Sequence, residues 1–249
     1  MKKLALLLAL VMTFTCFVAC GGSKKLVVGI TDFAPMDYKD ANGNWIGFDA
    51  DMATAFAKSM GMEVEFVEID WDNKIAELDA GSIDAVWNGM TLTDEVKNGM
   101  STSNPYCNTA QVVVVPADKA AKYQTKEALK DLVFAVEAGS AGEAAVKELG
   151  NKYSAVKDQA AALMEVAAGT SDACIIDLLM AGAMIGEGTS YENLTYTVKL
   201  TTEEYGVGFK KGSDLTEKLN QFFKDAYADG SMMETAKKYG VQESIIEQK

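Results

Sequence analysis

The stretch Glu77-Leu-Asp-Ala-Gly-Ser-Ile-Asp-Ala-Val-Trp-Asn-Gly89 carries a clear structural pattern. It reads as the end of a helix, a glycine that stops the helix, and a buried strand. A similar stretch, Glu165-Val-Ala-Ala-Gly-Thr-Ser-Asp-Ala-Cys-Ile-Ile-Asp177, begins 88 residues later and is identical at five of thirteen positions. Helix–glycine–strand is common enough to occur twice by chance, so shared design is one of two readings. Either way, Asn88-Gly89 and Asp177 stand at the carboxyl ends of two strands, where open α/β sheets bind ligands.

Strand-like and helix-like runs alternate along the rest of the chain. This pattern is typical of an α/β protein with mostly parallel sheets. Polar residues before the helical runs predict N-caps at Asp49 and Asp72 and capping boxes at 214–217 and 231–234, with a break at Asp229-Gly230. Strands are expected at residues 26–30, 64–69, 112–115, 132–136 and 173–176.

Composition excludes several classes of function. The 249 residues carry 23 Lys+Arg against 36 Asp+Glu, a formal net charge of −13 that argues against nucleic acid as a partner. The sequence contains neither His nor Arg. It therefore has no Ser-His or Cys-His pair, no His-ligated zinc and no guanidinium for a carboxylate or phosphate. We expect no catalytic residues, no metal and no cofactor.

The N-terminus reads as a secretion signal. Lys2 and Lys3 precede an apolar run that ends at Cys20, and Gly21-Gly22-Ser23 follows. The run resembles a bacterial lipobox, in which the cysteine is lipidated and becomes the new N-terminus; an ordinary cleaved signal or an uncleaved anchor is the alternative. We expect residues 1–19 to be a signal peptide and 20–25 a lipidated tether. This arrangement places the protein at the cell membrane, on its extracytoplasmic face.

Two cysteines remain in the mature chain, Cys107 and Cys174. A disulfide between them is possible outside the cell, but two buried free thiols are the favoured reading.

The order of short motifs resembles family 3 of the bacterial extracellular solute-binding proteins, which feed amino-acid ABC importers. The resemblance covers residues 26 to about 239. Its motifs are Val28-Gly-Ile-Thr-Asp-Phe-Ala-Pro-Met36, Gly47-Phe-Asp-Ala-Asp51, Asp70-Trp-Asp72, Gly81-Ser-Ile-Asp-Ala85, Asn88-Gly-Met-Thr-Leu-Thr93, Ser103-Asn-Pro-Tyr106, Ala138-Gly-Ser140, Gly169-Thr-Ser-Asp-Ala173, Asp177, Tyr205-Gly-Val-Gly-Phe209 and Ala228-Asp-Gly230.

The resemblance implies a two-lobed, periplasmic-binding-protein-like clamshell of type II, with two hinge strands. Lobe 1 would hold residues 26–108 plus 206–249, and lobe 2 residues 109–205. The function implied is a monomeric substrate-binding lipoprotein that captures an amino acid or related amine and delivers it to an ABC permease. A dehydratase-like enzyme on the same scaffold and a lipoprotein sensor are the alternatives.

The resemblance also assigns a ligand site. Phe33 and Trp71 match walls that cover the ligand, and Asp177 matches the carboxylate that pairs with its α-ammonium. The remaining matched positions offer backbone groups or a hydroxyl, with Asn88 beside them as a possible amide: Gly89, Thr91, Gly139, Ser140 and Ala141. Glu137 matches a wall position and favours more positive charge in the ligand.

Val96 departs from the family pattern. It stands where the family has the Arg that holds the ligand's α-carboxylate, and Lys97 is one residue away, about 100° around a helix. Three readings follow. Helix N-terminal amides and Lys97 hold the carboxylate, the ligand lacks an α-carboxylate, or the site suits a cationic ligand.

Overall fold

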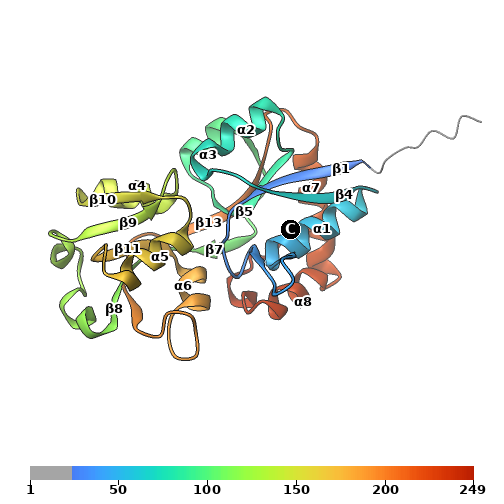
Figure 1. Cartoon of the computed structure of the whole chain (residues 1–249). Helices are drawn as coiled ribbons and strands as arrows, with labels where there is room; N and C mark the ends of the chain where they lie inside the picture. The colour runs from blue at the N-terminus through green and yellow to red at the C-terminus, as the bar shows by residue number, and fades with distance from the viewer. Residues whose placement is uncertain (1–23) are drawn as a thin grey trace, which may run out of the picture.

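The computed structural model describes residues 24–249 and contains two α/β lobes, each built on its own mixed sheet (Figure 1). The expected signal peptide and Cys20 lie outside the described residues. Among residues 24–249, no helix combines the length and apolar character needed to cross a membrane.

The sheet of the first lobe has the order β4-β1-β5-β13-β6, and β7 also pairs with β13. Three strands form its parallel part, and β13 runs antiparallel to β5, β6 and β7. The strands are β1 (Lys25–Ile30), β4 (Glu63–Glu68), β5 (Ala85–Thr91), β6 (Ser101–Thr102), β7 (Cys107–Thr109) and β13 (Glu203–Phe209).

Helices and short elements cover this sheet on both sides. They are α1 (Phe48–Ser59), η1 (Trp71–Asn73), α2 (Lys74–Ala80), α3 (Asp94–Gly99), α7 (Leu215–Ala228), α8 (Ser231–Lys238) and η4 (Gln242–Ser244), with a small pair of strands, β2 (Tyr38–Lys39) and β3 (Trp45–Ile46). Phe56, Trp87 and Phe223 meet in the core between α1, β5 and α7.

The sheet of the second lobe has the order β10-β9-β11-β8-β12. Its parallel part is again three strands, and β8 lies antiparallel to both β11 and β12. The elements are β8 (Gln111–Pro116), η2 (Ala117–Lys122), η3 (Lys126–Leu129), β9 (Val133–Glu137), α4 (Ala141–Leu149), β10 (Lys152–Val156), α5 (Gln159–Ala168), β11 (Ala173–Asp177), α6 (Leu178–Met184) and β12 (Leu194–Lys199).

The chain crosses between the lobes twice, from β7 into β8 and from β12 into β13. Glu203, at the second crossing, accepts hydrogen bonds from the Thr91 hydroxyl of the first lobe and the Gln111 amide of the second. These bonds tie β5, β8 and β13 together at the point where the two sheets meet.

The two similar stretches fold alike. Helix α2 ends at Gly81 and β5 follows; helix α5 ends at Gly169 and β11 follows. Both glycines adopt the left-handed conformation, with φ of 76° and 75°, which favours glycine over any other residue. The expected strands are confirmed to within one residue at each end, but the sheets are mixed rather than mostly parallel because the chain returns through β8 and β13.

The expected helix starts are wrong in detail. Helix α1 begins at Phe48, and the Asp49 carboxylate turns inward to accept hydrogen bonds from the Gly89 N–H and the Tyr106 hydroxyl. Asp72 lies within η1, so Asn73 precedes α2.

The two C-terminal helices do break at Asp229-Gly230, and Asp214 is the N-cap residue of α7 as expected, but neither helix has the expected side-chain capping bond. The Asp214 carboxylate forms an ion pair with Lys218, and Ser231 is already the first residue of α8.

Candidate functional site

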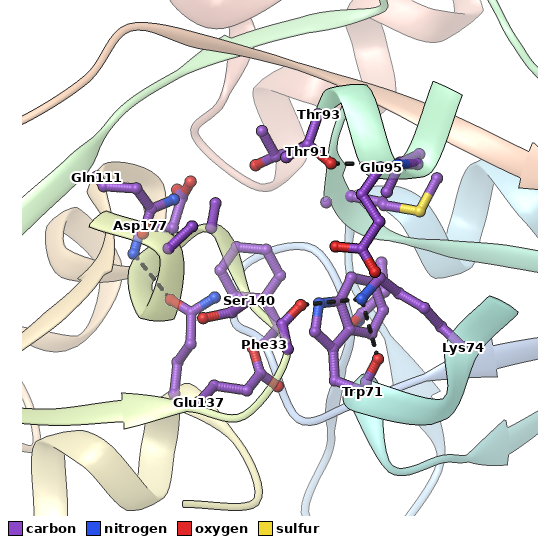
Figure 2. A pocket seen from close by; sticks show the side chains of 18 of the residues that line it. Phe33, Trp71, Lys74, Thr91, Thr93, Glu95, Gln111, Glu137, Ser140 and Asp177 are labelled. Carbon is purple, nitrogen blue, oxygen red and sulfur yellow. Dashed lines mark hydrogen bonds between the residues drawn. The ribbon is translucent and has the colours of Figure 1, made fainter. Parts of the chain in front are cut away.

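A cavity of about 270 Å³ lies between the lobes, at the carboxyl ends of β5, β9 and β11 (Figure 2). It is lined by Phe33, Trp71, Lys74, Asn88, Gly89, Met90, Thr91, Thr93, Asp94, Glu95, Val96, Gln111, Glu137, Gly139, Ser140, Ala141, Ala144, Gln159 and Asp177. All nine residues that the sequence assigned to the site are among them, as is Glu137.

The first lobe supplies the aromatic walls. Phe33 is buried and lies directly over Gly89, where an added Cβ would stand 2.2 Å from the Phe33 Cε1 atom. Gly89 also has a φ of 53°, so this position needs glycine for both space and conformation. Trp71 in η1 forms the second wall. Aromatic faces of this kind can cover an aliphatic or flat ligand and exclude water from it.

The end of β5 is held by a buried hydrogen-bond network. Oδ1 of Asn88 accepts from the N–H and hydroxyl of Thr31, and its Nδ2 donates to the Thr31 carbonyl and to Asp37 Oδ2. The Gly89 N–H donates to Asp49 Oδ2 at 2.6 Å. The Asn88 amide is therefore fully engaged within the protein, and the residue positions the cavity wall instead of offering a free amide.

The N-terminus of α4 faces the cavity from the second lobe. The Ser140 hydroxyl caps the helix by accepting from the Glu143 N–H, and the Glu143 carboxylate accepts from the Gly139 N–H. This arrangement is a variant of the capping box, because the return hydrogen bond comes from Gly139, one residue before the N-cap Ser140. The N–H groups of Ala141 and Gly142, the first two residues of the helix, have no acceptor within the helix and suit an anionic group.

Asp177 ends β11 and serves two roles. Its Oδ1 accepts from the Leu179 N–H at 2.8 Å and so caps α6, while its Oδ2 accepts from the Thr109 hydroxyl at 2.6 Å. The side chain also lines the cavity. Burial raises the pKa of Asp177 to about 6, against the hydrogen bonds that lower it.

Glu137 ends β9 and is 2% exposed. Its Oε1 atom has no hydrogen-bond partner in the protein. Burial raises the pKa of Glu137 to about 8, and Asp158 adds to this rise. A buried carboxylate oxygen with no partner, beside a cavity, is a position at which a ligand donor can bind.

Lys74 is a site residue that the sequence analysis missed. Its ammonium lies on the right of Figure 2, where it donates to two carbonyl oxygens, those of Trp71 at 3.1 Å and Gly139 at 2.9 Å. The spacing from Trp71 is a signal that could have found it, since residues three apart on a helical turn share a face.

Lys97, the cation that the sequence suggested, lies elsewhere. It is exposed and lines a separate hollow with residues 201–204. Val96 is 3% exposed and gives the cavity an apolar wall.

Cysteines and potential metal ligands among the described residues form no further site. Cys107 and Cys174 are buried free thiols. No group of three or more potential metal ligands gathers anywhere in residues 24–249.

Comparison with known proteins identifies the family. Residues 26–242 match the model of the bacterial extracellular solute-binding proteins, family 3. The arginine-binding extracellular protein ArtP of Bacillus subtilis (strain 168) is 31% identical over 96% of this chain and 98% of its own. The L-arginine-binding protein of Pseudomonas aeruginosa is 30% identical over 96% of each chain.

Solved structures of amino-acid-binding proteins have the same fold as this chain. An ancestral arginine-binding protein bound to arginine superimposes with a TM-score of 0.80 at 32% identity, covering 86% of this chain and 97% of its own. A substrate-binding protein of an ABC uptake transporter from Streptococcus pneumoniae, with bound histidine, gives 0.77 at 30% identity, over 86% and 92% of the two chains. This chain is a member of family 3 of the bacterial extracellular solute-binding proteins.

Proposed function

We propose that this protein captures an amino acid with a cationic side chain and delivers it to an ABC permease. The chain is an extracellular amino-acid-binding protein of ABC transport and not an enzyme, as its family and relatives show. The observation that carries the choice of ligand is the pair of buried carboxylates, Asp177 and Glu137, at the ends of neighbouring strands in one cavity. Relatives named for arginine and histidine support it.

Each proposed contact follows from the charges and faces of the cavity. Four lining residues are acidic, Asp94, Glu95, Glu137 and Asp177, and one is basic, so the cavity favours a cation. Asp177 pairs with the α-ammonium, and Glu137 receives the charged end of the side chain at its unpartnered Oε1. Phe33 and Trp71 cover the aliphatic part of the ligand between them.

Isothermal titration calorimetry on the purified protein tests the ligand class. The probes are L-arginine, L-lysine and L-histidine against L-glutamine and L-glutamate. We expect L-arginine or L-histidine to bind most tightly. Preference for glutamine or glutamate would contradict the assignment.

The Glu137→Gln variant tests the side-chain contact. Loss of a charged hydrogen-bond partner costs about 1.5–3 kcal/mol, or roughly 10- to 100-fold in affinity for the cationic ligand. Affinity for glutamine should stay within about threefold. Glu148→Gln, on the exposed side of α4, is the matched control. Equal affinity in the Glu137 variant and the control would remove Glu137 from the site.

Membrane attachment and closure of the lobes are parts of the same proposal. Lipidation at Cys20 would hold the protein beside the permease, and Cys20→Ala should remain unprocessed or leave the membrane fraction.

Two chain crossings are suited to act as a hinge, so saturating ligand should reduce the radius of gyration in small-angle scattering. An unchanged radius would indicate a rigid cavity.

A further inference from the structure

Lys74 is a buried cation that forms no direct ion pair. It is 4% exposed, and none of the ion pairs found among residues 24–249 includes it. Burial lowers the pKa of its ammonium, against the charges of Glu95, Glu137, Asp72 and Glu143, which raise it, Glu95 most. The Glu95 carboxylate points toward the ammonium in Figure 2 but forms no ion pair with it. A cation so placed costs solvation free energy, which its two hydrogen bonds to carbonyl oxygens only partly offset.

The ammonium has one donor left. Lysine carries three N–H groups, and two are used by the carbonyl oxygens of Trp71 and Gly139. Lys74 also lines the cavity, and it is the one basic residue among those that do so. Its remaining N–H and its charge are therefore available to an acceptor inside the cavity.

The bond to Gly139 also fixes where that acceptor would sit. Gly139 precedes the Ser140 cap and the first helical residue of α4, Ala141. The ammonium is therefore bonded to the segment that leads into α4, and Ala141 lines the same cavity. The ammonium and the free N–H groups of the α4 N-terminus together suit a carboxylate. The neighbouring wall at Val96 is apolar and offers no donor from its side chain.

We propose that Lys74 binds the α-carboxylate of the amino-acid ligand, together with the N-terminal N–H groups of α4. This proposal rests on the proposed function, because it presupposes an amino acid in the cavity. Lys74 belongs to the first lobe and α4 to the second, so the ligand's carboxylate would be held from both sides. Lys74 is then a specificity-determining residue: it selects ligands that keep the carboxylate over the corresponding amines.

A matched pair of ligands tests this assignment. One is the amino acid that the wild-type protein binds most tightly, and the other is the amine left when its α-carboxyl group is replaced by hydrogen; L-arginine with agmatine is the expected pair. The wild-type protein should bind the amino acid at least 10-fold more tightly. Lys74→Met should weaken binding of the amino acid by about 10- to 100-fold and change binding of the amine by less than threefold.

Two further variants distinguish loss of the Lys74 contact with the ligand from a non-specific effect of substitution on the protein. Lys74→Arg keeps the charge and the donors and should retain most of the discrimination, which also covers the case in which Lys74→Met fails to fold. Lys58→Met, exposed on α1, should match the wild type for both ligands.

The outcomes are distinct. Equal loss for the amino acid and the amine in Lys74→Met would show that Lys74 only bridges the lobes, and would overturn the proposal. Equal binding of both ligands by the wild-type protein would overturn it as well, while leaving the proposed function intact. Failure of the wild-type protein to bind any amino acid would overturn both.

Discussion

Each lobe has a pair of buried carboxylates in or directly behind the cavity wall, and the two pairs are placed differently. Asp37 and Asp49 of the first lobe lie behind the cavity wall, where they accept hydrogen bonds from Asn88, Gly89 and Tyr106. Asp177 and Glu137 of the second lobe line the cavity itself.

Burial raises the pKa of all four carboxyl groups. The pKa therefore does not separate acids that hold the fold from acids that face a ligand. Position at the end of a strand, in the lining of the cavity, is the feature that does.

The largest effect is expected from Asp177→Asn. Asparagine can still cap α6 and bond to Thr109, but it carries no charge for the ligand's ammonium. Removing one partner of a buried charge pair costs about 2–5 kcal/mol, or roughly 30- to 4000-fold in affinity. Calorimetry should show this loss with little change in the melting temperature of the ligand-free protein.

Asp131→Asn, exposed in the same lobe, is the control for Asp177→Asn. Wild-type affinity in the Asp177 variant would mean that the Asp177 carboxylate stabilises the fold, as Asp37 and Asp49 do, and does not contact the ligand.

Asn88→Ala should act in the opposite way. It leaves Thr31 and Asp37 without their buried partners, so we expect a loss of about 2–4 kcal/mol in the free energy of unfolding. Affinity should fall much less, because the Asn88 amide is engaged within the protein. Denaturant titration and calorimetry on the same sample measure the two quantities. A larger loss in binding free energy than in unfolding free energy would show that Asn88 contacts the ligand directly.

The Asp49→Asn variant tests how the first-lobe pair, Asp37 and Asp49, makes stability depend on pH. Because the folded protein raises the pKa of Asp49, the folded state binds the proton more tightly than the unfolded chain. The wild-type protein should therefore lose stability as the pH rises from about 5 to 8. The Asp49→Asn variant should be nearly as stable as the wild-type protein at pH 5, where Asp49 is protonated and the asparagine oxygen can accept from the Gly89 N–H in the same way. Because the amide does not ionise, the variant should lose less stability than the wild-type protein between pH 5 and pH 8.

Denaturant titrations at both pH values measure the Asp49 effect. An identical pH slope in the wild-type protein and the variant would show that Asp49 is not the titrating group.

The smallest effect concerns Glu137 without ligand. Its pKa of about 8 lies above the ordinary range, so the ionised form destabilises the folded state increasingly from pH 5 to 8. Glu137→Gln should therefore be more stable than the wild-type protein by about 1 kcal/mol at pH 8 and nearly equal to it at pH 5. Thermal unfolding checks this. A less stable variant at pH 8 would place Glu137 with the acids that hold the fold.

The fold was predictable because its signals are local. Gly81 and Gly169 stop helices wherever they occur, and the apolar runs of β1, β8 and β11 need only a buried sheet. The helix starts were not predictable in the same way. Asp49 looks like a cap in sequence, but its carboxylate is drawn inward by Gly89 and Tyr106, which lie 40 and 57 residues away.

The residues of the candidate site differ in the same way: some are placed by local sequence signals and others by distant partners. Asp177 and Glu137 could be placed at the cavity from the sequence because the family resemblance matches both positions and each residue ends a strand. Lys74 could not, because its partner Gly139 is 65 residues away in the other lobe. The use of the Asn88 amide was hidden for the same reason.

The position of β13 has a consequence for the order of folding. This strand lies inside the first sheet, between β5 and β6, yet Glu203 follows Thr91 by 112 residues. A chain emerging from its N-terminus can complete the sheet of the second lobe first, while β5 of the first lobe waits with one edge unpaired. The first lobe is thus synthesised first but finished last, and a chain cut short before residue 203 would keep that edge open to aggregation.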